Sequence, residues 1–455
     1  MPSPPCDSAR RIAAGAVAAH LLWEIATLAR TRRAARTALA PPPAPPRLDA
    51  DESAAVLHLL VPALAEQPYV RRTVAAFAAV RDAYPHAHVW FVTTTREQRP
   101  ATDGMTTRDA LERALAGTDS ERMEVLHDPS PAGNKASQLN WAVHRLDRRP
   151  DLLDDRAWVG VFDFDSQPHP DTAAWVAARA RRGRPEAIQV VPINVTTLTG
   201  PPANAFARAV ILTEGLHHAT RSLGVERWKL DRSEAGRRMP QYLVGAGMFV
   251  RRDALRTAGG FPFVDDVPLG YRMFLDRARF ATVPVLNRVD LPDTIAAHLE
   301  SLKLIARGVI SWVPVLGASR ASRTVHGWDR FRLAGLGVAD TAELTTYPWL
   351  AAILTPTLLR RSWSGRILAA AWWGFPIAQT AVMRHVLADE LSSDTWRVPT
   401  PALAGVSIAR RFWRTIGAWR LAVDAARARL RGGAVSFSKP SRSAGTGPGG
   451  ADGPM

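Results

Sequence analysis

Apolar segments of strand length alternate with segments of helical periodicity between residues 54 and 165, and this alternation restricts the fold more than any other feature. The run 54–62 is continuously apolar and ends at Pro62, as is typical of a parallel strand buried on both faces. Such alternation predicts an α/β fold, with a mostly parallel sheet flanked by helices. The predicted strands are 54–62, 88–95, 123–129 and 158–165, and the predicted helices are 70–84, 107–117 and 136–146. Ligands of these sheets bind beyond the carboxyl ends of the strands.

Two aspartates, Asp163 and Asp165, end the fourth predicted strand, with the apolar Phe164 between them. Residues two apart on a strand face the same way, so both carboxylates can share a hard cation such as Mg²⁺ or Mn²⁺. Such a cation neutralises phosphate oxygens and helps a diphosphate to leave. An isolated Asp-x-Asp step is also common at ordinary strand ends and turns, so its context decides.

The context upstream is a turn that leads into a helix. Gly133 and Asn134 form the turn, Lys135 follows, and the helix is predicted to begin near Ala136. Free backbone N–H groups at a helix N-terminus attract anions, and Lys135 adds positive charge there. The alternative is a simple turn with a solvated lysine.

The context downstream combines glycines with a second pair of acids. Gly245 and Gly247 allow a ligand to approach the backbone closely. Asp265 and Asp266 precede a predicted helix that begins near Val267. A carboxylate that points into a cleft can act as a general base, whereas an acid at a helix start can simply cap it. One member of the pair can cap while the other does chemistry.

Taken in order, these segments resemble the family 2 glycosyltransferases, in particular the membrane-associated bacterial members. The resemblance covers residues 54–312, and the similar segments are 59–77, 132–143, 162–171, 244–261 and 264–274. It implies a GT-A fold, a nucleotide-diphosphate sugar donor, a divalent cation (Mg²⁺ or Mn²⁺), and inversion at the anomeric carbon. A nucleotidyltransferase is the alternative enzyme class, but the first strand lacks the glycine-rich phosphate loop expected of one.

The resemblance also implies roles for individual residues. Asp165 is the expected metal ligand, and Asp163 assists the metal or contacts the donor. Asp266, or its neighbour Asp265, is the expected general base. The expected donor-binding residues are Pro62, Glu66, Thr93, Thr94, Lys135, Asn140, Asp163, Gly245 and Gly247. Thr93 and Thr94 stand where the family often has an acid that contacts the nucleobase, which leaves the nucleobase open.

The segments outside residues 54–312 suggest contact with a membrane. Residues 12–29 form an apolar helix with arginines on both sides, which predicts a membrane anchor in residues 1–40 or a helix packed on the protein. A proline-rich linker follows at 41–53. Residues 313–431 are predicted to be a helical membrane-associated region with one span at 367–383; two crossings or a soluble helical domain are the alternatives. Its last part, 410–431, has the pattern of a basic amphipathic helix suited to lipid head groups, and 432–455 is a predicted disordered tail.

The net charge and the cysteine content limit the classes of partner and the disulfides that the chain can have. The net charge is +16, which suits an anionic membrane or a nucleic acid, but nearly all of it is arginine, a bias that base composition of the gene explains. A basic non-enzymatic membrane-binding protein is a further alternative. The acids at the strand ends argue against it and against a nucleic-acid partner. The single cysteine, Cys6, cannot form an internal disulfide. The expected partners are the donor, a lipid-linked or glycan acceptor and membrane lipids, with the catalytic domain on the cytoplasmic side.

Overall fold

The computed structural model describes most of the chain. The described residues are 5–46, 55–97, 104–116, 122–149, 157–196, 204–262, 266–292, 294–320, 322, 324–359, 363–391 and 398–430. The predictions for Asp265, for most of the linker and for the tail 432–455 lie outside them.

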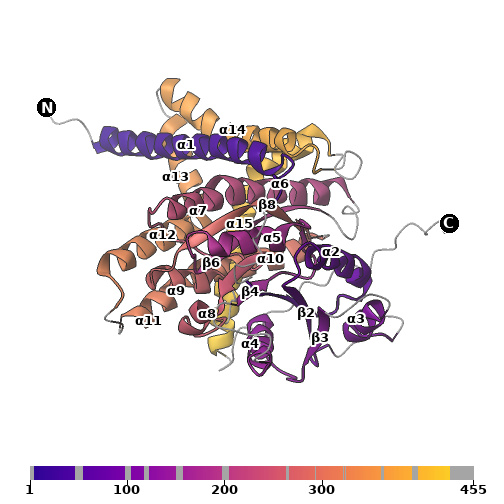
Figure 1. Cartoon of the computed structure of the whole chain (residues 1–455). Helices are drawn as coiled ribbons and strands as arrows, with labels where there is room; N and C mark the ends of the chain where they lie inside the picture. The colour runs from indigo at the N-terminus through magenta and orange to yellow at the C-terminus, as the bar shows by residue number, and fades with distance from the viewer. Residues whose placement is uncertain are drawn as a thin grey trace.

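An eight-stranded sheet forms the centre of the described part of the chain, in the order β3-β2-β1-β4-β7-β6-β8-β5 (Figure 1). The strands are β1 (Leu57–Pro62), β2 (Ala87–Thr94), β3 (Met123–Asp128), β4 (Trp158–Val161), β5 (Gln167–Pro168), β6 (Ala187–Thr196), β7 (Met248–Arg251) and β8 (Phe280–Asp290). All neighbouring pairs among β3, β2, β1 and β4 are parallel, as are β6 and β8. β7 runs antiparallel to β4 and β6, and β5 runs antiparallel to β8. The prediction of a mostly parallel α/β sheet is therefore confirmed.

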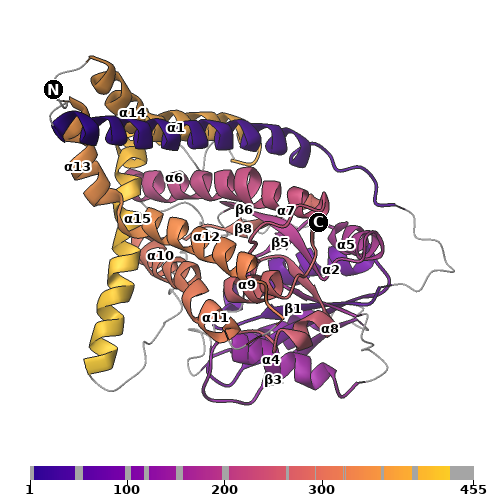
Figure 2. The same cartoon turned by 90° about the vertical axis from the view of Figure 1, so that its left-hand side faces the viewer.

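The helices surround this sheet and extend to one side of it (Figures 1 and 2). In the first half of the chain they are α1 (Pro5–Ala38), α2 (Val70–Asp82), α3 (Thr107–Leu115), α4 (Lys135–Leu146), α5 (Thr172–Arg181), α6 (Ala205–Arg221) and α7 (Arg227–Glu234), with a short 3₁₀ helix η1 (Gln67–Tyr69) and a π-helical turn η2 (Ser222–Glu226). The others are α8 (Arg252–Thr257), α9 (Val267–Leu275), α10 (Ile295–Ile310), α11 (Trp312–Ser319), α12 (Gly327–Thr345), α13 (Tyr347–Leu359), α14 (Trp363–Val386) and α15 (Thr400–Leu430).

Both faces of the sheet are covered, which explains why β1 is apolar at every position but His58. Leu57, Leu59 and Val61 pack towards α2, α3 and α5. Leu60 packs on the other face, towards α4, α8 and α9. His58 shares that second face, where its Nδ1 accepts a hydrogen bond of 3.1 Å from the indole of Trp90. A strand buried on both sides has no alternating polar face.

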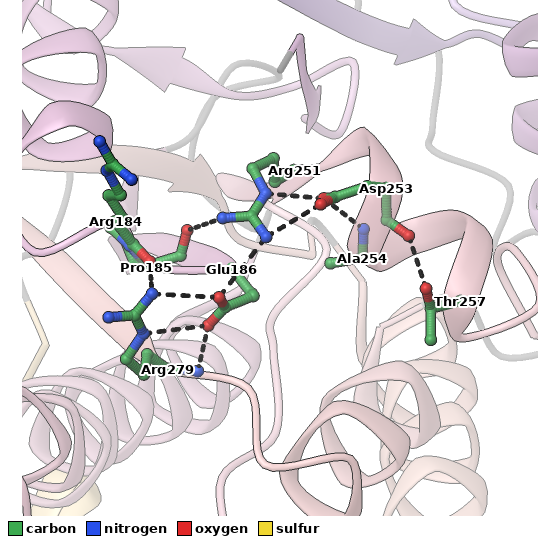
Figure 3. Close-up of polar contacts among 8 residues, drawn as sticks. All are labelled: Arg184, Pro185, Glu186, Arg251, Asp253, Ala254, Thr257 and Arg279. Atoms are coloured by element: carbon green, nitrogen blue, oxygen red, sulfur yellow. Dashed lines mark hydrogen bonds and ion pairs between the residues drawn. The ribbon is translucent and has the colours of Figure 1, made fainter. Parts of the chain in front are cut away.

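The edge of the sheet where β7 ends is held by charged side chains (Figure 3). The Glu186 carboxylate, just before β6, accepts the Arg279 backbone N–H at 2.7 Å and lies 3.5 Å from the Arg251 guanidinium. Arg251 in turn donates to Asp253 at 2.6 Å. Burial raises the pKa of Asp253, but the Arg251 hydrogen bond and charge, together with the Ala254 N–H, outweigh burial and lower the pKa. The three strands β6, β7 and β8 are thus joined at the edge opposite to that described below.

The helices beyond the catalytic segment pack directly on it. α1 runs beside α6 and α14 in both views, and α15 crosses them (Figures 1 and 2). Three arginines of α15, Arg410, Arg411 and Arg414, are buried rather than presented to lipid head groups. Arg414 lies 3.4 Å from Glu214 of α6 and 3.3 Å from Glu343 of α12. The first part of the predicted basic amphipathic helix therefore forms an internal contact.

Two helical stretches of the described chain are long and apolar enough to cross a membrane, Arg11–Ala38 and Ile295–Ser319. The predicted span 367–383 is not one of them; it lies within α14, where the buried Gln379 and Thr380 bond to Arg410 and Ser407 of α15. The second stretch joins α10 and α11 and crosses the domain boundary predicted at residue 312. Buried helices of water-soluble proteins have the same length and composition, so these stretches are only candidates.

Candidate active site

Four chain segments meet at one edge of the sheet. β1 ends at Pro62 and β2 at Thr94, and β4 ends at Val161 beside them. β7 begins at the same edge because it is antiparallel, with Gly247 donating its N–H to the Val161 carbonyl at 2.8 Å. The residues that follow three strands and precede a fourth are thereby brought together from positions as far apart in the chain as Pro62 and Gly247.

The Asp163–Asp165 step forms a turn rather than the end of a strand. β4 stops at Val161, and the Ser166 N–H donates to the Asp163 carbonyl at 3.0 Å. Phe164 is buried in the core, where its carbonyl accepts a 2.9 Å hydrogen bond from Thr73. The expectation that the two aspartates share a strand face is therefore wrong. A turn around an anchored phenylalanine holds them instead.

The two aspartates of this turn differ in environment. Asp163 is half exposed, and its Oδ1 lies 2.8 Å from the Nζ of Lys135, the first residue of α4. Asp165 is 8% exposed. Asn134 caps α4 by accepting the Ser137 N–H at 2.9 Å, which places Lys135 beside the turn. The predicted Gly-Asn-Lys turn and helix start thus lie next to the Asp-Phe-Asp turn.

The end of β2 is closed by an arginine. Thr93 is fully buried and bonds to the His127 ring at 3.0 Å. The Thr94 hydroxyl accepts from Arg96 Nε at 3.1 Å, and the same guanidinium donates to the Gly133 carbonyl at 2.9 Å and to Gln138 at 3.0 Å. Arg96 therefore ties the end of β2 to the turn before α4.

Glu66 lies at the start of η1, on the other side of the β1 end. It is 4% exposed, and its N–H donates to the Thr107 hydroxyl at 2.9 Å. Glu97 accepts both the N–H and the hydroxyl of Thr107, at 2.9 and 3.0 Å. The Glu97 carboxylate, only three residues beyond Thr94, thus holds the N-terminus of α3 near Glu66.

Asp266 stands at the N-terminus of α9 and points its carboxylate to the glycine segment. Its Oδ2 accepts the Gly245 N–H at 2.8 Å, and its Oδ1 accepts the Val267 N–H at 2.6 Å. Gly247 has φ +106°, and a Cβ there would lie 2.9 Å from the Val190 carbonyl oxygen. α9 is close to this segment because Gly270 has no side chain; a Cβ on it would lie 2.4 Å from the Leu243 nitrogen.

Asn140 bonds to the backbone of a residue that lies away from the strand ends of the site. Its amide donates to the Phe261 carbonyl and accepts the Phe261 N–H, both at 2.8 Å. These two bonds join α4 to the segment that leads towards Asp266. The structure thus gives Asn140 a supporting contact, whereas the sequence suggested contact with the donor.

The carboxylate oxygens at this edge of the sheet are ligands that suit a hard divalent cation. Within the described residues, no group of three or more His, Cys, Asp or Glu side chains could hold a metal ion. Mg²⁺ is commonly bound by only one or two carboxylates, and substrate phosphates and water complete its ligands. Asp163 and Asp165, two carboxylates in one turn beside Lys135, match that arrangement.

Comparison with known proteins identifies the family. The family model "Glycosyltransferase like family 2" matches residues 54–310. This match covers more than half of the 455 residues. The chain belongs to the family 2 glycosyltransferases. Membership decides between the enzyme classes considered above in favour of a glycosyltransferase, and the matched range contains every strand and each site residue named so far.

Several solved structures are similar in fold to this glycosyltransferase. One is the mannosyltransferase PcManGT from Pyrobaculum calidifontis in complex with GDP-Man and Mn²⁺, with 15% identity, a TM-score of 0.48, and coverage of 90% of this chain and 99% of that chain. Another is S. aureus TarS 1-349 in complex with UDP-GlcNAc, with 12% identity, a TM-score of 0.40, and coverage of 84% and 94%. A search of curated protein sequences gives no match. Likenesses this distant assign neither a substrate nor the role of a residue.

Some polar residues of the glycosyltransferase site were not predicted from the sequence. Arg96 and Glu97 lie two and three residues beyond Thr94, and Gln138 lies in the helix that follows the Gly-Asn-Lys turn, so their positions were a signal that could have been used. Gln189 bonds to the glycine segment from β6, and Tyr242 bonds to Glu226 of η2. Their partners are distant in sequence or lie in an irregular segment, and no local pattern announces them.

Proposed function

We propose that this family 2 glycosyltransferase moves a sugar, with inversion, from a nucleotide-diphosphate donor to a lipid-linked or polysaccharide acceptor. The observation that carries the proposal is the arrangement at one sheet edge. The acidic turn beside Lys135 follows β4, and the Asp266 carboxylate is held by Gly245, just before the neighbouring strand β7. Direct displacement needs a stabilised leaving group on one side of the sugar and a base on the other.

The acidic turn is the proposed leaving-group side. Asp165, with Asp163, would hold Mg²⁺ or Mn²⁺, which would supply charge neutralisation for the leaving diphosphate. Lys135 and the positive end of the α4 helix dipole add positive potential beside it. Pro62, Glu66, Thr93 and Thr94 line or support the neighbouring strand ends on the side proposed for the nucleotide. When the donor binds, Lys135 exchanges its carboxylate partner Asp163 for a phosphate of the donor, and Asp163 exchanges Lys135 for the metal.

Asp266 is the proposed general base. A base must lie within hydrogen-bond reach of the acceptor hydroxyl, and the Gly245 N–H fixes one carboxylate oxygen at 2.8 Å. Val190 of β6 fills the space beside Gly247, so Gly245, whose N–H holds Asp266, is the glycine of this segment that we place next to the sugar. Asp265, the neighbour in sequence, remains the second candidate.

A membrane surface is the proposed location of the acceptor. α1, α13 and α14 pack on one another and carry large apolar side chains on their outer surfaces. Those side chains are Ile12, Leu22, Trp23 and Ile25 on α1, Trp349, Leu350, Ile353 and Leu359 on α13, and Trp363 and Ile367 on α14. Figure 2 shows α13 and the N-terminal half of α1 on the side away from the sheet. An apolar surface of this extent suits lipid, and the arginines after residue 29 favour a cytoplasmic catalytic domain.

Donor and metal are tested together by thermal shift. GDP-mannose, UDP-N-acetylglucosamine and other nucleotide sugars are added to the purified full chain with and without Mn²⁺. We expect one base and sugar to raise the midpoint of unfolding, and only when the metal is present. If none of the nucleotide sugars or nucleoside diphosphates gives a metal-dependent shift, the proposed donor class is contradicted.

Two substitutions test the assigned carboxylates. Asp165→Ala is expected to abolish metal-dependent donor binding and to lower turnover at least about a hundredfold. Asp266→Asn is expected to retain donor binding and to lose transfer by about a hundredfold or more. Asp82→Ala, which removes a largely exposed carboxylate at the end of α2, is the control and should leave both unchanged. Transfer by Asp266→Asn at a near wild-type rate would move the base to Asp265 or elsewhere.

A further inference from the structure

The segment 237–247, between α7 and β7, is irregular, although it carries the N–H that holds Asp266. None of these described residues lies in a helix or strand. Gly245 and Ala246 are nevertheless buried. Backbone groups that are buried without regular structure must find partners elsewhere. The partners of this segment therefore determine where the Gly245 N–H points.

Gln189 of β6 supplies the partners next to Gly245. Its Oε1 accepts the Val244 N–H at 2.9 Å, and its Nε2 donates to the Val244 carbonyl at 3.2 Å. The same Nε2 donates to the Val190 carbonyl at 2.9 Å. Gln189 is 3% exposed. One side-chain amide thus imitates a strand neighbour for both backbone groups of Val244.

Two further contacts hold the segment from the other side. The Tyr242 hydroxyl donates to Glu226 of η2 at 2.5 Å. α9 lies against the backbone of Tyr242 and Leu243 because Gly270 has no side chain. The segment is therefore fixed immediately before Val244 as well as at Val244, and Gly245 is the next residue after the Gln189 contact.

We propose that Gln189 is a positioning residue for the Asp266 carboxylate, an inference that rests on the proposed role of Asp266 as the base. Gln189 acts through the Val244 backbone, which orients the Gly245 N–H towards Asp266 Oδ2. Without that N–H the Asp266 carboxylate loses the hydrogen bond that orients its Oδ2 and can turn away from the acceptor. Small displacements of a reacting group cost large factors in rate, so the effect is expected in kcat and not in donor binding.

Gln189→Leu and Gln189→Glu separate positioning from general support. In Gln189→Leu both backbone groups of Val244 lose their partner, and kcat is expected to fall about ten- to a hundredfold. In Gln189→Glu the outcome depends on pH. The ionised carboxyl turns an oxygen to the carbonyls of Val190 and Val244, which repel it, whereas the protonated carboxyl donates to Val244 as the amide does. Burial favours the protonated form, so the ratio of variant to wild-type kcat is expected to rise about fivefold or more between pH 8 and pH 6.

Thr282→Val is the matched control. Thr282 is buried on the neighbouring strand β8, and its hydroxyl donates to the Gln189 carbonyl at 2.9 Å, so the variant loses a comparable buried hydrogen bond away from Val244. Its kcat is expected to stay within about twofold of wild type. The reaction followed is hydrolysis of GDP-mannose or UDP-N-acetylglucosamine with Mn²⁺, in which water replaces the acceptor, and the KM of the nucleotide sugar should be unchanged in all three variants.

Hydrogen exchange of the ligand-free full chain gives a result that needs no substrate. In Gln189→Leu, peptides covering residues 243–247 and 266–270 should both exchange faster than in wild type and in Thr282→Val. Faster exchange at 243–247 alone, an unchanged kcat, or a kcat ratio for Gln189→Glu that is flat with pH overturns the positioning role. Asp266→Asn tells the two proposals apart. Full activity of Asp266→Asn contradicts the assignment of Asp266 as the base. An inactive Asp266→Asn together with a normal kcat of Gln189→Leu contradicts only the positioning role of Gln189.

Discussion

Gly247 shows how one residue can hold the edge of the site. Its φ of +106° is unfavourable for any side chain, and a Cβ would lie 2.9 Å from the Val190 carbonyl oxygen. Gly247→Ala is therefore expected to lower the free energy of unfolding by about 2–4 kcal/mol and to reduce transfer, because β7 shifts. Gly335→Ala is the matched control; Gly335 lies in α12 with no atom within 4 Å of its would-be Cβ, so the variant should gain about 0.5–1 kcal/mol. Chemical denaturation measures both, and equal effects would contradict the conformational argument.

Residues whose partners are close in sequence were predictable, and the others were not. Asn134 and Lys135 could be placed at a turn and helix start because the capping partner, Ser137, is three residues away. The Asp163–Asp165 step was predicted to extend the strand because the apolar pattern continues through Phe164. The turn depends on Thr73, which is 91 residues distant. Gln189 is 55 residues from Val244, and such a contact leaves no periodicity in the chain.

At the scale of elements, the tight contact between α1 and η2 makes the N-terminal helix part of the catalytic unit. A Cβ on Gly224 would lie 2.1 Å from the Thr31 hydroxyl and 2.9 Å from the Thr27 carbonyl oxygen. Gly224→Ala is expected to cost about 1–3 kcal/mol, and Thr31→Ala in the same chain should restore part of the loss. Gly15→Ala, in an open position of α1, should not destabilise. Thermal unfolding of the four variants gives the coupling, and additive effects would contradict the contact.

The interface of α6 with α15 predicts a loss of stability on acidification. Burial lowers the pKa of His218 to about 4, although Glu214, 3.4 Å away, opposes the shift. Because this value is below the ordinary 6.5, the unfolded chain takes up the proton first as the pH falls from 6.5 towards 4. His218→Gln should therefore remove about 1–2 kcal/mol of the difference in unfolding free energy between pH 7 and pH 5. Urea titrations at both pH values measure it, with the exposed His144→Gln as control, and an unchanged difference would show that His218 takes up its proton in the folded chain.

The elements of the catalytic half were more predictable than those of the helical half. Strand and helix segments up to residue 146 have local periodicity, so their order and the parallel sheet followed from the pattern. Residues 410–431 were interpreted as lipid-facing because arginines dominate one side of the helix. In the structure Arg414 is neutralised by Glu214 and Glu343. A helical pattern shows that a face is charged, and it does not show whether that face meets water, lipid or another helix.

At the scale of the whole molecule, the apolar surface of α1, α13 and α14 predicts binding to lipid vesicles. Replacing Trp349 and Trp363, which are 61% and 75% exposed, by serine should weaken binding to vesicles containing anionic lipid about tenfold or more. The control is Phe206→Ser, which replaces an exposed aromatic residue of α6. Flotation of the chain with vesicles measures binding. Unchanged flotation of the double variant would exclude this surface as the membrane contact.

The salt bridges of Arg414 also have a consequence for how the protein is made. A ribosome delivers Glu343 71 residues before Arg414 and Glu214 much earlier still. Glu343 already has a guanidinium partner in Arg221 of α6, 3.0 Å away, but until α15 emerges the Glu214 carboxylate lacks one, so the face of α6 that carries it cannot be buried without leaving that charge unpaired. The helical half therefore completes its folding late in synthesis. A nascent chain interrupted before α15 would expose the unfinished interface to chaperones and proteases.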